Sequence, residues 1–332
     1  MQMDKTIKSI AILRLSAIGD VCHAMAVVHA VQKEYPDASI TWITGPLEAQ
    51  IVKLLPNVKV CIFDKKQGWK GMWALKRSFV GDKFDVLLHL QWSIRASFVS
   101  RMIPAKRRIG FHPSISREKQ HWFVNDYGEQ PARAHVLDSF LSVSARIGVS
   151  SIELPLPLNL PESRVCGDYV VLNPSASKAE RNWTEEGYRE LIDWLVSNGQ
   201  RVILTGGGSA AEKQLASMLT TSGVENLVGQ TSLPEMMSIL ASAKLVISPD
   251  TGPAHMATIV GATVVGLYAH SNPKRTGPYC DLDKVVSVYE QMAEKEYGKP
   301  VSELPWATRV HSADAMKAIT CEQVIAQVRS LI

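Results

Sequence analysis

Short apolar runs alternate with amphipathic stretches along the whole chain, which has 332 residues. Apolar runs of about four to eight residues are typical of buried strands, and apolar residues three or four positions apart are typical of helices. Strands that alternate with helices pair in parallel, because each helix returns the chain to the same end of the sheet. The alternation therefore predicts an α/β protein made of Rossmann-like, doubly wound sheets.

The length of the chain exceeds what one hydrophobic core usually organises, so two domains of roughly 150 residues are expected. Residues 154–161, Leu-Pro-Leu-Pro-Leu-Asn-Leu-Pro, interrupt the alternation because proline cannot sit inside a helix or a central strand. We expect a first domain at 1–162, joined by a last helix at 313–332, and a second domain at 163–312, with a cleft between them. Strands are predicted at 9–15, 39–43, 58–63, 85–90, 107–111, 169–172, 201–204, 245–248 and 263–267, and helices at 21–34, 94–102, 184–197, 210–221 and 233–241.

The two halves of the chain differ in charge. Residues 1–165 hold 22 Lys and Arg against 14 Asp and Glu, and residues 166–332 hold 14 against 18, which gives +8 and −4. Unless this is chance variation of the surface, the first half faces an anionic partner such as phosphorylated lipid or nucleic acid. None of the recognised nucleic-acid-binding motifs is present, so no nucleic-acid partner is expected.

Composition also indicates where the protein works. The sequence contains no run of about 18 uncharged apolar residues, and its amino terminus lacks the features of a signal peptide. The five cysteines are widely spaced and form no C-x-x-C pair, which favours reduced thiols and argues against a zinc site. We therefore expect a cytoplasmic protein.

The first informative segment is a predicted strand that runs into a tight turn and a helix, residues 13–21. Such a turn lies at the carboxyl end of its strand, where open parallel sheets bind ligands. Gly19 lets the backbone approach a ligand, and Asp20 projects from the start of the helix. Asp20 can act as a catalytic base or as a helix cap, and the segment alone leaves both roles open.

A second segment of this kind joins a predicted strand, 245–249, to a helix that begins at about residue 253. The turn directs backbone amides and the Thr251 hydroxyl to one place, which suits the pyrophosphate of a nucleotide. Asp250 either caps the helix or binds sugar hydroxyls. His255 lies one turn inside the helix, and a lone histidine is more often structural.

Two further strand ends in the second half carry polar residues. Ser175, Ser177, Lys178 and Arg181 follow one strand, and the two cations either stabilise charge on a departing phosphate or are solvated loop residues. Three glycines, 206–208, follow the next strand, and Glu212 is placed to accept hydrogen bonds from ribose hydroxyls. The convergence of these segments predicts a nucleotide site in the second half.

Taken together, these segments resemble glycosyltransferase family nine, the bacterial ADP-heptose:lipopolysaccharide heptosyltransferases. The resemblance covers nearly the whole chain. It is carried by residues 14–21 (Arg-Leu-Ser-Ala-Ile-Gly-Asp-Val), 181–183 (Arg-Asn-Trp), 248–255 (Ser-Pro-Asp-Thr-Gly-Pro-Ala-His) and 271–279 (Ser-Asn-Pro-Lys-Arg-Thr-Gly-Pro-Tyr). Residues 289–309 are similar to the members that add the first heptose to Kdo on lipid A.

This resemblance implies a GT-B fold and an inverting transfer of heptose from ADP-heptose, with no metal or other cofactor. It implies that Asp20 is the general base. The donor would be bound by Ser175, Ser177, Lys178, Arg181, Glu212, Asp250, Thr251, Gly252 and His255. Many members have lysine where this chain has Arg181, so either Arg181 or Lys178 takes the phosphate-stabilising role.

The acceptor implied by the resemblance is an anionic, lipid-linked saccharide at the inner face of a membrane. Residues 65–79 interleave basic and aromatic side chains, which is typical of contact with an anionic membrane and also of an ordinary amphipathic helix. Gly19, Arg95 and Arg117 are candidate acceptor-binding residues, and Arg101 and 106–108 offer further cations. Asp281-Leu282-Asp283 matches a metal-binding D-x-D but is interpreted as a surface turn.

Two other functions remain compatible with the sequence. One is a sugar-nucleotide epimerase of similar fold, which needs no acceptor. The other is a non-catalytic protein that binds a nucleotide sugar.

Overall fold

The computed structural model describes residues 7–130 and 135–332, and they form two compact units, Met1–Asn159 and Leu160–Ile332. The amino-terminal residues assessed above for a signal peptide lie outside the described part of the chain. The boundary between the units falls in the predicted proline-rich linker.

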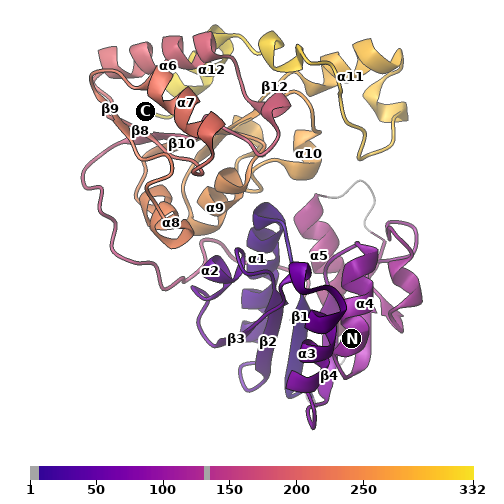
Figure 1. The fold of residues 1–332 in the computed structure, drawn as a ribbon. Helices are drawn as coiled ribbons and strands as arrows, with labels where there is room; N and C mark the ends of the chain where they lie inside the picture. Colours follow the sequence, from indigo (N-terminus) through magenta and orange to yellow (C-terminus); the bar gives the residue numbers. More distant parts are fainter. Residues whose placement is uncertain (1–6, 131–134) are drawn as a thin grey trace. The chain divides into compact units, whose positions relative to one another are not determined.

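The first unit is built on a parallel sheet with the strand order β3-β2-β1-β4-β5-β6 (Figure 1). Its core strands are apolar and almost entirely buried, as a sheet covered by helices on both faces requires. The strands are β1 Ser9–Leu13, β2 Ser39–Thr44, β3 Val58–Ile62, β4 Phe84–His89, β5 Ala105–Gly110 and β6 Asp126–Tyr127. The helices are α1 Ile18–Glu34, α2 Ala49–Val52, α3 Gly68–Ser78, α4 Ile94–Met102 and α5 Val136–Ser144, with short 3₁₀ turns η1 Lys65–Gln67, η2 Gln120–Trp122 and η3 Ala145–Ile147.

The second unit repeats this topology, with the strand order β12-β11-β10-β7-β8-β9, all parallel. Its strands are β7 Val170–Leu172, β8 Val202–Leu204, β9 Val224–Asn226, β10 Leu245–Pro249, β11 Val264–Tyr268 and β12 Val286–Ser287. Its helices are α6 Glu185–Ser197, α7 Ala210–Leu219, α8 Leu233–Ala241, α9 Gly252–Val260, α10 Pro273–Thr276, α11 Tyr289–Tyr297 and α12 Cys321–Arg329, with 3₁₀ turns η4 Ala179–Arg181, η5 Leu282–Lys284, η6 Val301–Glu303 and η7 Ala315–Ala318.

The strand order identifies one special position in each sheet. Numbered within its own unit, each sheet has the order 3-2-1-4-5-6. Strands 1 to 3 are therefore added toward one edge of the sheet and strands 4 to 6 toward the other, and the change occurs between strands 1 and 4. In such sheets ligands bind beyond the carboxyl ends of these two strands, because the following loops diverge there. The positions are the ends of β1 and β4 in the first unit and of β7 and β10 in the second.

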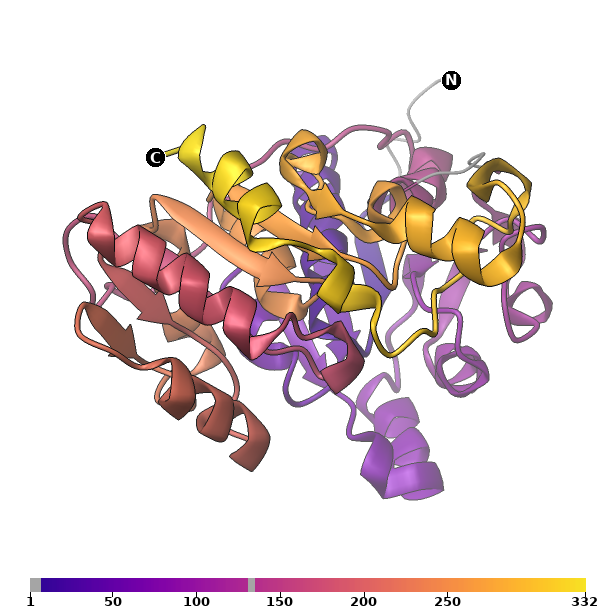
Figure 2. The ribbon, with the colours of Figure 1, turned by 90° about the horizontal axis from the view of Figure 1, so that it is seen from above.

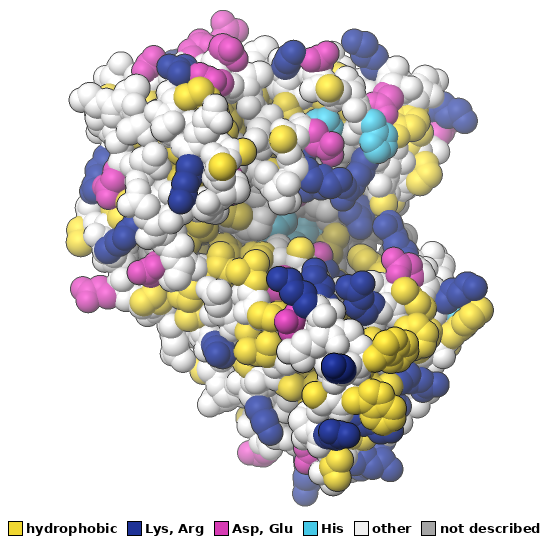
Figure 3. Space-filling view, in the orientation of Figure 1, with side chains coloured by type: hydrophobic (Ala, Val, Ile, Leu, Met, Phe, Trp, Pro, Cys, Tyr) yellow, Lys and Arg dark blue, Asp and Glu magenta, His cyan; other side chains and the backbone are white. Residues whose placement is uncertain are grey.

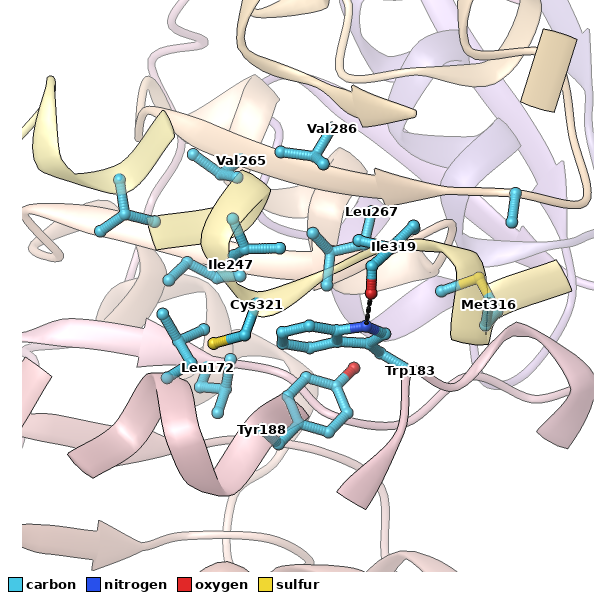
Figure 4. Close-up of a cluster of buried hydrophobic side chains, with 14 of the residues drawn as sticks. Leu172, Trp183, Tyr188, Ile247, Val265, Leu267, Val286, Met316, Ile319 and Cys321 are labelled. Atoms are coloured by element: carbon cyan, nitrogen blue, oxygen red, sulfur yellow. Dashed lines mark hydrogen bonds between the residues drawn. The ribbon is translucent and has the colours of Figure 1, made fainter. Parts of the chain in front are cut away.

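The core of the second unit contains Trp183, whose indole is buried (Figure 4). Its ring packs edge-on against Tyr188 with 5.2 Å between ring centroids, and its Nε1 donates to the backbone oxygen of Ile319 at 2.9 Å. The loop that carries Arg181 is therefore anchored to the core through Trp183, two residues further along the chain.

The carboxyl-terminal segment differs from the prediction. The expected helix 313–332 is a 3₁₀ turn, η7, followed by α12, and Thr320 begins α12 with a capping box. Its buried face, including Val324 and Val328, joins the core of the second unit, and α12 packs against α6 (Figures 1 and 2). The expectation that this segment joins the first domain is thus wrong.

Two further features of the described residues concern their helices and their cysteines. No helix within residues 7–130 and 135–332 is long and apolar enough to cross a membrane. All five cysteines lie in the described ranges and are free thiols.

Candidate active site

The segment that leaves β1 is held from both neighbouring strands. The amide of Leu15 donates to the Gln91 side chain at 2.7 Å, and the backbone oxygen of Leu15 accepts from the amide of Gly45 at 3.0 Å. A Cβ on Gly45 would lie 2.7 Å from that oxygen, so only glycine permits this approach. The turn before α1 is therefore fixed at the position where the strand order reverses.

Asp20 lies in the first turn of α1, but it is not the residue that caps the helix. The N-cap is Ala17, which has no side-chain cap. The Asp20 carboxylate instead accepts a hydrogen bond from the guanidinium of Arg14 through Oδ2. The Asp20 side chain is 34% exposed, so it is accessible to a ligand while a buried cation orients it.

Arg14 is enclosed by the first unit. Its Nη1 donates to the backbone oxygen of Leu90 at 2.6 Å, and its guanidinium lies 5.2 Å from the centroid of the Phe140 ring. Burial lowers the pKa of Arg14, and the nearby carboxylates of Asp20 and Glu48 oppose that effect. A buried cation needs an anionic partner, so Arg14 and Asp20 depend on one another for their positions.

The candidate acceptor residues lie around the same end of the first sheet. Gly19 precedes Asp20 in the first turn of α1, and Arg95 is exposed at the start of α4. Arg117 is exposed in the loop after β5, where its guanidinium lies 5.7 Å from the Trp92 ring centroid.

The basic residues of β5 have other roles. Lys106 pairs with Asp85 at 2.7 Å, Arg107 pairs with Asp126, and Arg108 donates to backbone oxygens, including that of Ile103 at 2.7 Å. These three side chains are engaged within the fold, and their contact with an acceptor stays a prediction.

In the second unit, β7 and β10 end in a buried polar cluster. Asn173 follows β7, and its Nδ2 donates to the backbone oxygen of Ser175 at 3.0 Å and to the hydroxyls of Ser248 and Thr251, each at 3.4 Å. The Ser248 and Thr251 hydroxyls are 2.8 Å apart. This network fixes Thr251, the N-cap residue of α9.

The amino terminus of α9 presents backbone amides. Thr251 provides no side-chain cap, and α9 begins at Gly252 with Pro253 next. Uncapped amides and the positive end of the helix dipole favour a bound anion. This arrangement is the one predicted from the sequence for a pyrophosphate.

Asp250 gathers three side chains beside this helix terminus. Arg181 Nη1 lies 3.3 Å from Asp250 Oδ2 and donates to the Asp250 backbone oxygen at 3.1 Å. The Ser271 hydroxyl donates to Asp250 Oδ2 at 2.5 Å, and His255 Nε2 lies 4.0 Å from Oδ1. Asp250, Thr251, Gly252, His255 and Arg181 are thus brought together as predicted.

Arg181 and Lys178 are distinguished by their surroundings. The Arg181 side chain is 16% exposed and is held against Asp250, whereas the Lys178 side chain is 54% exposed and pairs with Glu180 at 3.7 Å. Ser175 is buried and Ser177 is exposed on the same loop. Arg181 is therefore the cation of this loop that is held in place by the fold, whereas the Lys178 side chain is largely exposed to solvent.

Glu212 has a structural role beside its predicted one. It completes a capping box with Ser209 at the start of α7, and its Oε1 accepts from the amide of Gly207 at 2.9 Å. The carboxylate therefore shapes the glycine loop after β8. Contact with a ribose stays a prediction.

The D-x-D sequence is not a surface turn throughout. Asp283 is exposed, but Asp281 is buried, where its Oδ2 accepts from the amide of Val264 at 2.9 Å and its Oδ1 pairs with Lys284 at 2.9 Å. Asp281 therefore fixes the start of β11. No cluster of three or more His, Cys, Asp or Glu that could hold a metal ion occurs among the described residues.

Comparison with known proteins agrees with this geometry. Residues 72–307 match Glycosyltransferase family 9 (heptosyltransferase). The chain belongs to this family. It is a glycosyltransferase. Membership of this family argues against the alternative that the protein is a sugar-nucleotide epimerase.

Among the family's relatives, the chain is 41% identical over 336 residues to the lipopolysaccharide core heptosyltransferase OpsX of Haemophilus influenzae, covering 98% of this chain and 97% of the relative. It is 23% identical to lipopolysaccharide heptosyltransferase 1 of Escherichia coli, covering 81% of this chain and 90% of the relative.

The fold is shared with solved structures of the family. The structure of the E. coli heptosyltransferase WaaC with ADP has a TM-score of 0.78 at 20% identity, covering 98% of this chain and all of that one. A family 9 glycosyltransferase from Veillonella parvula has the same TM-score at 21% identity, covering 98% of this chain and 97% of that one. These similarities confirm the predicted GT-B fold.

Sequence reasoning missed several residues of the two sites. Arg14 and Ser271 stand inside the quoted family segments, but no pattern indicated that they would pair with Asp20 and Asp250. Asn173 directly follows a predicted strand, and that position was its available signal. Gly45 carries no sequence signal, because its importance depends on contacts with a distant segment.

Proposed function

We propose that this protein transfers heptose from ADP-heptose to the inner core of lipopolysaccharide, on Kdo-lipid A or a nearby core sugar. The observation that carries this proposal is the 41% identity to a lipopolysaccharide core heptosyltransferase over nearly the full length of both chains. Support comes from the uncapped amino terminus of α9 with its Asp250 cluster, and from the accessible carboxylate of Asp20.

The proposed chemistry is a direct displacement with inversion. The acceptor hydroxyl oxygen forms a bond to the anomeric carbon of heptose while the bond from that carbon to the diphosphate breaks and ADP leaves. Asp20 takes the proton of the hydroxyl, and Arg14 orients the carboxylate. Because the proton moves to Asp20 while the new bond forms, neither a free alkoxide nor a protonated ether oxygen accumulates.

The departing diphosphate gains negative charge in the transition state. The amides at the start of α9 and the cations Arg181 and Lys178 would stabilise this charge without a metal ion. Asp250 and His255 would bind the donor's sugar, and Glu212 would bind its ribose.

Product analysis tests this function. Purified protein is incubated with ADP-heptose alone and with ADP-heptose plus Kdo-lipid A, and the products are analysed by mass spectrometry. We expect ADP and a heptosylated lipid only when the acceptor is present. Isomerised sugar nucleotide without acceptor, or no transfer to any core acceptor, would contradict the proposal.

We further propose that the first unit binds the cytoplasmic surface of an anionic membrane, where a lipid-linked acceptor is presented. The contact surface, here called the aromatic face, consists of Trp69 and Trp73 of α3, Phe98 of α4 and Trp122 of η2. Trp69 and Trp73 are 66% and 56% exposed, although the same helix buries Met72 and Leu75. Hydrophobic and basic side chains intermingle over this part of the first unit in Figure 3.

The charges near the aromatic face favour a lipid surface. Lys76 lies 5.1 Å from the Trp73 ring centroid and Lys119 lies 4.5 Å from that of Trp122. Three further lysines are exposed in η1 and α3, namely Lys65, Lys66 and Lys70. Exposed indoles insert at the level of lipid headgroups, and lysines attract anionic lipids.

Vesicle sedimentation tests the aromatic face. Replacing Trp69 and Trp73 by alanine is expected to reduce binding to vesicles of phosphatidylglycerol and phosphatidylethanolamine at least fivefold. The control is Met218→Ala, an exposed apolar residue of α7 in the second unit. Equal binding by the double variant and the control would refute this surface.

A further inference from the structure

The second unit contains a pocket that lies beside the Asp250 cluster and is lined mainly by residues to which the sequence assigned no role. It is formed by the loop after β7, the residues after β11 and the segment that precedes η7. Ser271 and Arg309 form an antiparallel bridge that joins the last two of these. The lining residues are Lys178, Glu180, Arg181, His270, Ser271, Arg309, Val310 and His311.

His270 offers a hydrogen-bond acceptor to this pocket. The residue is 4% exposed, and its Nδ1 lies 2.9 Å from the backbone oxygen of Val310. A carbonyl oxygen only accepts, so Nδ1 carries a proton, and in the neutral form of an imidazole with that tautomer Nε2 carries a lone pair. Nε2 has no hydrogen-bond partner among the described residues. Buried polar atoms are normally satisfied, so this nitrogen is available to accept from a group that enters the pocket.

The charge of the pocket is positive. Arg309 is exposed, and its guanidinium makes no ion pair or hydrogen bond with the described residues. Arg181 and Lys178 also line the pocket, but Arg181 is paired with Asp250 and Lys178 with Glu180, so the unpaired positive charge of the lining comes from Arg309. An arginine without a partner beside a pocket is suited to a phosphate or a carboxylate, which its planar fork binds through two hydrogen bonds.

We propose that this pocket binds an acidic sugar group, with His270 Nε2 accepting from a sugar hydroxyl and Arg309 binding the adjacent anionic group. The inference deepens the proposed function and rests on it. Two substrates carry this chemistry: the donor, as a sugar joined to a diphosphate, and the acceptor, as a sugar that bears a carboxylate or phosphate.

Steady-state kinetics with each substrate varied in turn tests the proposal and identifies the source of the group. Arg309→Ala is expected to raise KM about tenfold or more for one substrate, because a charge-assisted hydrogen-bond pair is lost, with kcat within about threefold of the wild type. A raised KM for ADP-heptose identifies the donor, and a raised KM for Kdo-lipid A identifies the acceptor. Lys299→Ala, an exposed cation between α11 and η6 that does not line the pocket, is the control.

Two substitutions of His270 distinguish the roles of its two ring nitrogens. In His270→Asn the amide nitrogen replaces Nδ1 and preserves the bond to Val310, whereas in His270→Gln the amide reaches the position of Nε2. We expect the asparagine variant to raise the same KM as Arg309→Ala and the glutamine variant to retain more of the affinity. Circular dichroism melting verifies that each variant is folded.

Unchanged KM values, within twofold of the wild type, for Arg309→Ala and His270→Asn would overturn the inference while leaving the proposed transfer intact. Absence of transfer by the wild-type protein would instead refute the proposed function. In that case, calorimetric titration of ADP-heptose and of Kdo-lipid A into the same variants still reports whether the pocket binds either one.

Discussion

Replacing Trp183 by phenylalanine tests how the loop of Arg181 is anchored. The substitution removes the Nε1 donor and leaves the buried backbone oxygen of Ile319 without its partner, which costs about 1–3 kcal/mol. The lost indole ring atoms add about 1–2 kcal/mol of transfer and cavity free energy. The expected total, about 2–5 kcal/mol, corresponds to a fall of roughly 4–20 °C in the melting temperature of a unit of this size.

Thermal unfolding followed by circular dichroism measures this effect, with ADP-heptose titrated calorimetrically into the folded variant. We expect weaker donor binding too, since Arg181 and Asp250 are positioned by the same loop. Trp194→Phe is the control, because Trp194 is only partly buried on α6 and packs beside Arg329. A melting temperature of Trp183→Phe within about 2 °C of the control would refute the anchoring role.

Two further predictions follow from the sites and their surroundings. Burial, with a smaller effect of Arg14, lowers the pKa of His89 from 6.5 to about 3. Between these pH values the unfolded chain binds more protons than the folded protein does. The free energy of unfolding therefore falls as the pH drops below 6.5. His89→Leu should therefore lose about 2 kcal/mol less stability than the wild type between pH 7 and pH 5 in urea unfolding, and identical pH profiles would contradict this cause. Arg181→Ala should reduce kcat more than Lys178→Ala, because Arg181 is held against Asp250 and Lys178 is largely exposed; the opposite order in a transfer assay would assign the phosphate-stabilising role to Lys178.

The fold was predictable wherever strands are apolar and long enough to be buried on both faces. The strand ends at β1, β7 and β10 were placed to within about two residues, because a continuous apolar run gives way to turn residues there. The strands β6 and β12 have two residues each, and β9 is the half-buried Val224–Asn226, so none carries a pattern that sequence reasoning detects.

The position of the last helix could not be predicted for a different physical reason. Amphipathic spacing in α12 shows that Val324 and Val328 face a core, but it does not specify which core. Its placement depends on the surface that α6 offers, and that surface exists only in the folded unit.

The candidate site was predictable to the extent that its residues stand at strand ends. Asp20 and Asp250 each follow a buried strand, and the sheet topology brings them to the positions where open parallel sheets generally bind ligands. The partners that orient them, Arg14 and Ser271, were not predicted, because polar pairing depends on side-chain directions. Arg309 is brought beside His270 by a backbone bridge to Ser271, 38 residues earlier in the chain, that no local pattern encodes.

The transfer rate of Asp20→Asn, measured together with calorimetric ADP binding, tests the account most directly. Asparagine retains the size of the side chain and a hydrogen bond to Arg14 but cannot take a proton, so transfer should fall by about a hundredfold or more while ADP affinity is unchanged. Turnover within about threefold of the wild type would show that another group accepts the proton, and the central claim would be wrong.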